Sequence, residues 1–560
     1  MRRFLPFALL LSCAHGPRPV QPEQWLELQT EHFVLRTDLA PRDAHRMAAD
    51  LEVVRAALLA AGWHSPRISK ARTQVIVLAD DRELQEYAAQ GIGGFVSGDA
   101  FGEPIMVVSG SQDAEDQRFL KHELTHVISN QFLVRNPRWV SEGLACYLEM
   151  LRFDRKQGQI AVGEMPADRL QYLRDSPVPS YWSIIETGRE AEQMSVHEGW
   201  AFETGAWILV HWLVDVRGPS FDDFLSRLSL GEDQFHAFAK VFPDLHEATI
   251  KAGIATYFKT PGLVRIYRAD APHWAGQVGE RTLPAGEVYA ILADLQRISP
   301  GYAPTPERVS RKTTLIAQAL QADPGNPLAV KLSDSADAAA ATAAHPDDWR
   351  AWLVFADKNS NDLAALRTAH RLAPENPVVL ARLSWAEAAH GDRETALKYA
   401  MRAVEIAPGR SEPLVVLGTV LADSGRCEEG ERYVLRAFDV LPDGADQNAI
   451  ASLKQTQRAI EDHCRKLGMD RTERRVLRRP TGCDPAGPRF GRRDKAKGKL
   501  SAEIVVSPDG KVGEVQVKGD ANASAVATVK KYLRSCKYEP VLEDGKPREA
   551  RWQVDFTVDR

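Results

Sequence analysis

Residues 121–126 read KHELTH and have the spacing of a metal site. Positions i and i+4 of an α-helix lie on one face, so His122 and His126 can bind one metal ion. Glu123 follows the first histidine and would face a water molecule at the metal, where a carboxylate can act as a general base. The pattern predicts a zinc site, and Zn2+ is the cofactor that we expect.

A third ligand is needed, because catalytic zinc usually has three protein ligands and one open position. Sixteen residues after the second histidine stands Glu142, within residues 138–145 (RWVSEGLA). Pro137 interrupts the chain before this stretch, so we expect a second helix that brings Glu142 back to the imidazoles. Glu149, two turns further along that helix, is the rival third ligand.

Together the two motifs resemble those of the gluzincin metallopeptidases of the peptidase MA-like kind. Members of this family carry H-E-x-x-H and then a helix reading W-x-x-E-G-x-A. The matching positions here are His122, Glu123, His126, Trp139, Glu142, Gly143 and Ala145. The resemblance spans residues 23–260. It implies an α+β zincin-like fold in which the two histidines and the downstream glutamate hold zinc and Glu123 is the catalytic base.

One part of the family pattern is not met. Some members have a tyrosine before an aromatic-rich helix, and this tyrosine stabilises the oxyanion. Residues 200–214 predict such an apolar helix, but Phe202 or Glu203 stands near the expected place of the tyrosine. The candidates for the oxyanion partner are therefore Tyr147, Tyr181 and His197.

The elements expected around the site follow from hydrophobic periodicity. Residues 25–36 and 73–79 predict strands, and residues 41–61 predict an amphipathic helix. Residues 104–109 (PIMVVS) predict a further strand. In the zinc peptidases that the sequence resembles, an edge strand beside the metal-binding helix binds the substrate backbone by strand addition, and residues 104–109 are the candidate for this strand.

Length and composition bound the remaining possibilities. A chain of 560 residues has room for three or four domains. Its 44% hydrophobic and 26% charged residues are ordinary for globular protein. The 71 basic and 76 acidic residues give a net charge of −5. Because no strongly basic domain stands out, nucleic acid is not an expected partner.

The N-terminus has the pattern of a targeting segment. Residues 1–13 combine two arginines, a short apolar run and the ending L-L-S-C, which resembles a bacterial lipobox. The resemblance implies a lipid on Cys13, a tether over residues 14–22 and an outer-membrane lipoprotein of the cell envelope facing the periplasm. An ordinary secretory peptide with a chance cysteine is the alternative. The apolar run is too short to span a bilayer.

A repeated pattern follows the peptidase-like region and a connector at residues 261–300. Residues 380–408 align with residues 414–442 at an offset of 34, with matching pairs Leu383 and Leu417, Gly391 and Gly425, and Pro408 and Pro442. This pattern resembles tetratricopeptide repeats, and it implies an all-α array over residues 301–470 that binds a peptide or protein partner. A plain spacer is the alternative.

The last part of the chain, residues 500–560, follows a linker at residues 471–499. Two strands joined by a turn, a helix and a last strand are expected at residues 500–507, 512–517, 526–535 and 550–558. This order resembles the TonB C-terminal fold and implies a small α+β domain that contacts other proteins. Cys483 and Cys536 are candidates for a disulfide there, and Cys427 with Cys464 is a weaker second pair.

The expected fold class is therefore multidomain, with an α+β zincin-like peptidase domain, an all-α repeat region and a small α+β C-terminal domain. The expected function is zinc-dependent hydrolysis of peptide bonds in the bacterial cell envelope. The alternative is a non-catalytic envelope scaffold or assembly lipoprotein that keeps the zinc site for structure. A peptidoglycan amidase uses similar metal chemistry and ranks last, since no stretch resembles a glycan-binding motif.

Overall fold

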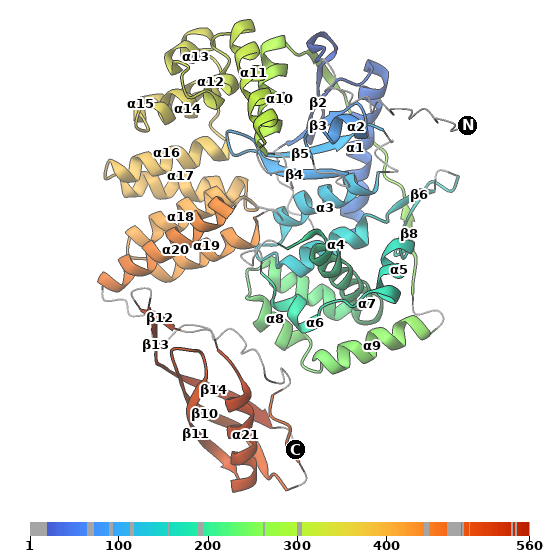
Figure 1. Ribbon diagram of the computed structural model, residues 1–560, viewed down its shortest axis with the longest axis vertical. Helices are drawn as coiled ribbons and strands as arrows, with labels where there is room; N and C mark the ends of the chain where they lie inside the picture. The colour runs from blue at the N-terminus through green and yellow to red at the C-terminus, as the bar shows by residue number, and fades with distance from the viewer. Residues whose placement is uncertain are drawn as a thin grey trace, which may run out of the picture. The chain divides into compact units, whose positions relative to one another are not determined.

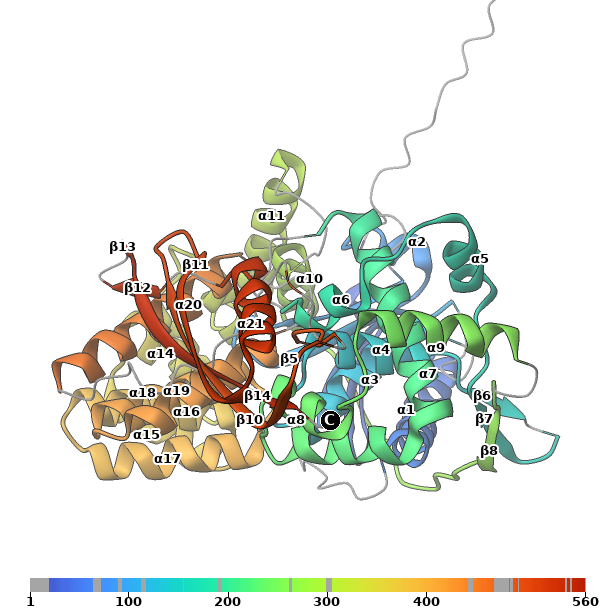
Figure 2. The same cartoon turned by 90° about the horizontal axis from the view of Figure 1, so that it is seen from below.

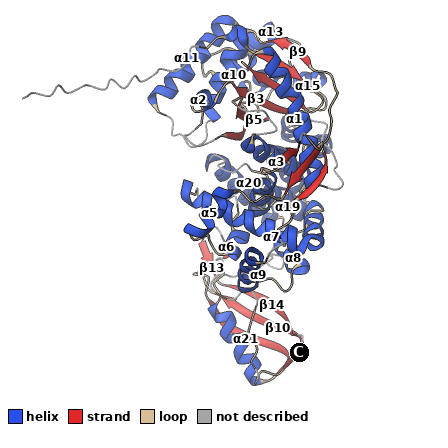
Figure 3. Cartoon of the chain, turned by 90° about the vertical axis from the view of Figure 1, so that its right-hand side faces the viewer, coloured by secondary structure: helices blue, strands red, loops and turns tan. Residues whose placement is uncertain are grey.

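The computed structural model divides into two compact units. The first comprises residues 1–179, 184–241 and 261–464, and the second comprises residues 180–183, 242–260 and 465–560. Strands gather in the N-terminal sheet and in the C-terminal module, whereas helices make up most of the chain between them (Figure 3). The structure describes residues 20–558 except 64–71, 89–92, 112–116, 155, 189–193, 261–263, 299–304, 442–446, 468–482, 484–486, 492, 539–540 and 544–545.

A six-stranded sheet forms the centre of the N-terminal part. Its strands are β1 (Leu26–Gln29), β2 (Phe33–Thr37), β3 (Thr73–Leu78), β4 (Gly94–Gly98), β5 (Pro104–Ser109) and β9 (Gly279–Thr282). They lie in the order β4-β5-β3-β2-β1-β9. Strands β2, β3 and β5 run parallel, and β4, β1 and β9 join antiparallel.

Four helices cover the two faces of this sheet: α1 (Pro41–Gly62), α3 (Arg118–Phe132), α10 (Ala285–Ile298) and α11 (Pro306–Ala322). Successive side chains of a strand point to opposite faces. Val75 and Val77 of β3 join an apolar cluster with α1 and α3. Ile76 and Leu78 join a second cluster with α10 and α11. Because both faces are buried, the parallel strands read as nearly continuous apolar runs.

A helical region follows α3 and completes the surroundings of the site. Its helices are α4 (Arg138–Leu148), α5 (Ala167–Asp175), α6 (Tyr181–Glu186), α7 (Val196–Ser229) and α8 (Gln234–Val241). A small sheet accompanies them, formed by β6 (Arg152–Asp154), β7 (Gln159–Val162) and β8 (Tyr267–Asp270). The remaining short or separate elements are η1 (Pro22–Gln24), α2 (Asp81–Leu84) and α9 (Glu247–Lys259).

Paired helices stack side by side through the repeat region (Figures 1 and 2). They are α12 (Pro327–Leu332), α13 (Ala338–Ala344), α14 (Trp349–Lys358), α15 (Leu363–Leu372), α16 (Pro377–Ala389), α17 (Arg393–Ile406), α18 (Ser411–Asp423), α19 (Cys427–Asp439) and α20 (Gln447–Lys466). The interval from the start of α16 to that of α18 equals the interval from the start of α17 to that of α19. Gly391 and Gly425 close the matching turns with φ of +90° and +80°. The expected helical repeats are therefore present.

The C-terminal module contains β10 (Ala496–Val506), β11 (Val512–Ala521), α21 (Ala523–Ser535), β12 (Val541–Glu543), β13 (Lys546–Arg548) and β14 (Ala550–Val558). Its main sheet has the order β11-β10-β14. Val529 and Leu533 of α21 pack in an apolar cluster with Leu500 and Ile504 of β10. The strand-strand-helix-strand order agrees with the order expected from the sequence. A disulfide joins Cys483 to Cys536, and another joins Cys427 to Cys464.

The structure differs from three expectations near the sheet. Residues 25–36 form two antiparallel strands, because the chain turns after Thr30, whose Oγ1 accepts a hydrogen bond from the Phe33 N–H at 3.2 Å. Residues 104–109 form β5, which lies between β3 and β4, so the edge strand on this side is β4. The range 261–300 was expected to be a connector, but it supplies β9 to the sheet and α10 to its second face.

Some expectations fall outside the described residues. Cys13, which is expected to carry a lipid, and most of the tether expected at residues 14–22 lie there, as does much of the linker expected at residues 471–499. Within the described part of the chain, no helix combines the length and apolar character needed to cross a membrane.

Candidate metal centre

Helices α3 and α4 carry the residues of the predicted zinc site, and close packing of α4 on α7 fixes its position. Trp139 is fully buried, with its ring 5.7 Å from that of Phe224 on α7. A Cβ at Gly143 would lie 2.4 Å from Cγ2 of Val210 and 2.8 Å from a backbone oxygen of α7. Only glycine therefore permits this approach of the two helices. The tryptophan and glycine that flank Glu142 hold α4 where its carboxylate faces α3.

The two histidines and Glu142 converge on one point. Nε2 of His122 lies 3.5 Å from Oε2 of Glu142, and Nε2 of His126 lies 3.5 Å from Oε1. The three ligand atoms all lie within 4.8 Å of one another. A separation of 3.5 Å is long for a charged hydrogen bond. It matches the spacing of about 3.3 Å that zinc bonds of about 2.0–2.1 Å give at tetrahedral angles. The donor set therefore fits a zinc ion.

Both histidines have a partner at the opposite ring nitrogen. Nδ1 of His122 lies 2.8 Å from Oε2 of Glu149, and Nδ1 of His126 lies 2.9 Å from Oγ of Ser141. Such contacts set the tautomer and orientation of metal-binding histidines, so that here each Nε2 faces Glu142. Because the contact with Glu149 has the length of a hydrogen bond, Glu149 acts as a support for His122, and the geometry favours Glu142 over Glu149 as the third ligand.

Glu149 is held as a carboxylate inside the protein. Arg118 donates to its Oε1 at 2.8 Å through Nε, and Arg169 donates to the same oxygen at 3.3 Å. Burial alone would raise the pKa of Glu149, but the hydrogen bond from His122 and the charges of Arg169 and Arg118 lower it to about 2. The negative charge on Glu149 makes the imidazole of His122 a stronger metal ligand.

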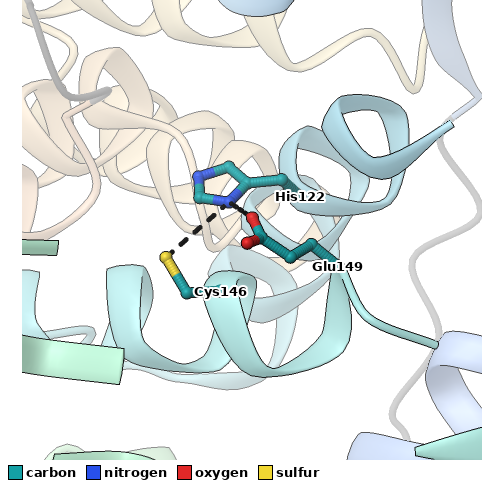
Figure 4. Close-up of side chains that lie close together, drawn as sticks. All are labelled: His122, Cys146 and Glu149. Atoms are coloured by element: carbon teal, nitrogen blue, oxygen red, sulfur yellow. Dashed lines mark hydrogen bonds and ion pairs between the residues drawn. The ribbon is translucent and has the colours of Figure 1, made fainter. Parts of the chain in front are cut away.

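Cys146 lies on the same side of His122 as Glu149 (Figure 4). Its Sγ is 4.0 Å from Nδ1 of His122, so these three residues form a second group of potential ligands. Burial raises the pKa of the Cys146 thiol to about 12, so the thiol is protonated when no metal is bound. The hydrogen bond between His122 and Glu149 also occupies the nitrogen that a metal there would need. Cys146 is therefore a buried small side chain beside the candidate site.

Glu123 lies against the edge strand of the sheet. A Cβ at Gly94 of β4 would stand 3.7 Å from Cγ of Glu123. A Cβ at the preceding Gly93 would stand 2.0 Å from the ring of Phe119, one helical turn before Glu123. The two glycines thus let β4 approach helix α3 closely. The same glycines have low strand propensity, so the sequence alone does not predict a strand here.

The candidates for an oxyanion partner are scattered. Tyr147 is buried with its ring 5.1 Å from that of His211, and Tyr181 belongs to the second compact unit. His197 is exposed. Burial and the charge of Glu142 raise the pKa of Glu203, which lies 3.5 Å from Arg169. Glu203 thus borders the metal site, and the oxyanion partner stays unassigned.

Sequence reasoning missed the residues that support the metal ligands. Glu149 stands seven residues after Glu142, and this helical spacing already places both on one face of α4. Ser141 directly precedes Glu142, and no motif in the sequence marks it as a hydrogen-bond partner of His126. Arg118 and Arg169 come from two other helices, and only the tertiary fold brings them to Glu149.

Known proteins resemble this chain in structure rather than in sequence. No family model matches the sequence, and no curated protein matches it. Similar solved structures include a thermophilic TPR protein of Thermus thermophilus, with 16% identity over 31% of this chain and 98% of that chain and a TM-score of 0.24. Another is Pseudomonas aeruginosa pilF, with 16% identity over 33% of this chain and 89% of that chain and a TM-score of 0.23.

Yeast Tom70 shares 11% identity over 51% of this chain and 63% of that chain, with a TM-score of 0.25. At scores this low, the description of the repeats rests on the helix pairs of the chain itself. Their regular interval and the glycines at their turns are those of tetratricopeptide-like repeats.

Proposed function

We propose that the chain is a zinc-dependent metallopeptidase of the gluzincin kind that hydrolyses peptide bonds. The observation that carries the proposal is the convergence of His122, His126 and Glu142, with N···O distances of 3.5 Å that suit a metal and with a hydrogen-bond partner behind each imidazole. The next helical position, Glu123, supplies a carboxylate that ligates nothing in this donor set.

The residues of the chain have separate roles in this reaction. Zinc, when bound, supplies Lewis acidity for the scissile carbonyl and lowers the pKa of a water molecule. Glu123 accepts the proton of the attacking water and passes it to the leaving nitrogen. Glu149 and Ser141 keep the two imidazoles oriented, so that the ligands need no rearrangement during the reaction.

Strand β4 supports a binding mode for the substrate. It is an edge strand of the six-stranded sheet, and it runs beside Glu123. An extended peptide that pairs with β4 by strand addition would bring its backbone alongside the catalytic carboxylate. This role falls to β4, in place of residues 104–109.

The remaining parts of the chain support a location of this activity in the cell envelope. The lipobox-like ending at Cys13 supports a lipoprotein of the outer membrane that faces the periplasm. The helical repeats and the C-terminal module, whose strand order is like that of TonB C-terminal domains, supply surfaces for protein partners. The two disulfides of the structure are compatible with an oxidising compartment.

The deciding experiment measures zinc and proteolysis on the same purified protein. Mass spectrometry of metals should find one zinc per chain, and much less in Glu142→Ala. Glu123→Gln should keep the zinc and lose about 100- to 10,000-fold in kcat/KM on labelled casein. Glu31→Gln, at a side chain 71% exposed, is the matched control and should behave like the parent. Zinc without any Glu123-dependent cleavage would favour the non-catalytic scaffold.

A further inference from the structure

The tip of the β4–β5 hairpin, residues 99–103, is a preformed turn. Oδ1 of Asp99 accepts hydrogen bonds from the N–H groups of Phe101 at 2.9 Å and Glu103 at 2.8 Å. Gly102 has φ of +84°, a conformation that favours glycine. A Cβ at Gly102 would also stand 3.2 Å from Oε2 of Glu412 on α18. The turn is therefore shaped for close contact with the repeat helices.

Phe101 at this tip is buried among the repeat helices. Its side chain is only 5% exposed, and its ring lies edge-on to Trp349 of α14 with 5.9 Å between the ring centres. Phe101 joins an apolar cluster whose other buried members come from α12 to α16, among them Val330, Ala351 and Leu353. A side chain of the peptidase-like sheet thus completes the core of the repeats.

Polar groups of the repeats hold the same tip. Arg410, which precedes α18, donates to the carbonyl of Gly102 and lies 3.9 Å from Oε1 of Glu103. Asn376, which caps α16, donates from Nδ2 to Oε1 of Glu103 at 3.1 Å. The N-terminal ends of α16 and α18, the first helices of two successive helix pairs, therefore bind one short turn.

Helix α10 binds the backbone of Gly98 and Ala100, on either side of Asp99. Oδ2 of Asp294 accepts the N–H of Ala100 at 2.9 Å, and Arg297 donates to the carbonyl of Gly98 at 2.8 Å. Arg297 also donates to Asp294 at 2.6 Å. The backbone at the end of β4 is thus hydrogen-bonded to a helix that packs against the sheet and against α11 and α12 (Figure 1).

The other end of β4 lies at the metal site. Gly94, which approaches Glu123, is separated from the tip by one short strand. We propose that the repeat helices bind the hairpin tip as an internal ligand and thereby hold β4 in position for substrate pairing beside Glu123. This inference rests on the proposed peptidase function. It makes the array a part of the enzyme, in addition to any surface that it offers to partners.

Phe101 and Arg410 are positioning residues in this scheme. They touch neither the metal ligands nor the edge where a peptide would pair, and they act through the backbone of β4. An edge strand gains a partner through its unpaired N–H and C=O groups, and only a strand of fixed register presents them to the substrate. Loss of the tip contacts should therefore weaken substrate binding more than the chemical step.

The experiment compares Phe101→Ala and Arg410→Ala with the parent in the full chain. Hydrogen–deuterium exchange should rise about tenfold at residues 94–98 in both variants, because the strand opens more often. KM for labelled casein should rise about tenfold while kcat changes by no more than about twofold. Zinc content should stay at the parental value.

Two further variants serve as controls for the loss of the tip contacts. Trp385→Ala removes a 49% exposed aromatic side chain from α16, outside the tip contacts described above, and should leave exchange and KM unchanged. Phe101→Leu keeps an apolar side chain at the buried position and should restore much of the protection lost in Phe101→Ala.

The outcomes separate this inference from the proposed function. Unchanged exchange at residues 94–98 in both tip variants would overturn the anchoring of β4, whatever the activity. Raised exchange with an unchanged KM would overturn the link between the anchor and substrate binding. If the parent itself cleaves nothing, the proposed function fails, and the exchange data still decide whether the repeats hold the strand.

Discussion

Nδ1 of His122 lies 2.8 Å from Oε2 of Glu149, so the nitrogen that does not face Glu142 is bound to a buried carboxylate. This pairing leaves Nε2 as the nitrogen directed at the metal position. It also distinguishes Glu142, the candidate ligand on α4, from Glu149, the C-cap residue of α4 that contacts the opposite nitrogen. The contact distance decides between them, because 2.8 Å suits a hydrogen bond and 3.5 Å suits two ligands of one ion.

We expect Glu149→Gln to weaken zinc binding about 10- to 100-fold, because the variant removes the negative charge behind His122. Competition with a chromophoric chelator measures the affinity. Asp168→Asn is the matched control, since Asp168 also pairs with Arg118 at 2.7 Å but is 46% exposed and does not contact His122. Equal zinc affinity in Glu149→Gln and the parent would contradict the supporting role of Glu149.

Ser141→Ala should also weaken zinc binding, but less than Glu149→Gln does. Ser141 offers His126 a neutral oxygen at 2.9 Å, and hydrogen bonds to charged groups are about twice as strong as those between neutral groups. The same chelator competition ranks the two variants. A larger loss in Ser141→Ala than in Glu149→Gln would show that charge behind the imidazole is not the main factor.

Glu27 makes the N-terminal sheet sensitive to acid. Burial alone would raise the pKa of Glu27, but the hydrogen bond from Arg281 and the charge of Arg36 lower it to about 2. A lowered pKa contributes stability that is present above the ordinary value of 4.5 and lost as the pH falls through 2. At neutral pH the ionised group stabilises the fold by about 3 kcal/mol.

We therefore expect Glu27→Gln to be clearly less stable than the parent at pH 6, with a smaller difference at pH 3. Urea unfolding at the two pH values measures both differences. Glu23→Gln, at an exposed position just before β1, should show no difference at either pH. If the free energy of unfolding differed between Glu27→Gln and the parent by the same amount at pH 6 and at pH 3, the ion pairs of Glu27 would not be the cause of the difference.

The disulfide between Cys427 and Cys464 should stabilise the end of the repeats. It closes a stretch with a sequence separation of 37, for which loop closure predicts about 4 kcal/mol. Tryptic digestion without reductant should yield the linked peptide pair. The double variant Cys427→Ser/Cys464→Ser should unfold α19 and α20 at lower urea concentration, as followed by hydrogen exchange. Unlinked peptides from unreduced protein would contradict the bond.

Local patterns predicted those parts of the structure that depend on residues close in sequence. The H-E-x-x-H spacing places His122 and His126 on one face of α3. The regular interval of the repeats predicts the helix pairs of the array. The missed features depend on long-range contacts. Strand β9 pairs with β1 although the two strands are far apart in the chain. Phe101 lies in a turn, and only the tertiary fold shows that repeat helices bury its side chain. Strand β4 was missed because its glycines serve the approach to Glu123, against strand propensity.

Asp99 should make the anchoring of β4 depend on pH. Burial, followed by the charges of Glu103 and Asp294, raises the pKa of Asp99 to about 7, against the backbone hydrogen bonds that lower it. Arg410, on Glu103, and Arg297, on Asp294, are the positive groups at the same tip. A carboxyl group with a raised pKa stabilises the docked hairpin least when it is ionised, so docking weakens as the pH rises from 3.8 through 7.

We expect exchange at residues 94–98, corrected for the intrinsic rate, to be slower at pH 6 than at pH 8. Asp99→Asn should remove this dependence, because its amide oxygen can still accept the two backbone hydrogen bonds and carries no charge at either pH. Asp81→Asn, at the start of α2 and away from the hairpin tip, is the control and should keep the parental dependence. If Asp99→Asn kept the pH dependence of the parent, Asp99 would not be its cause. The variant removes only the titration of Asp99, so another titratable group at the tip would then be responsible.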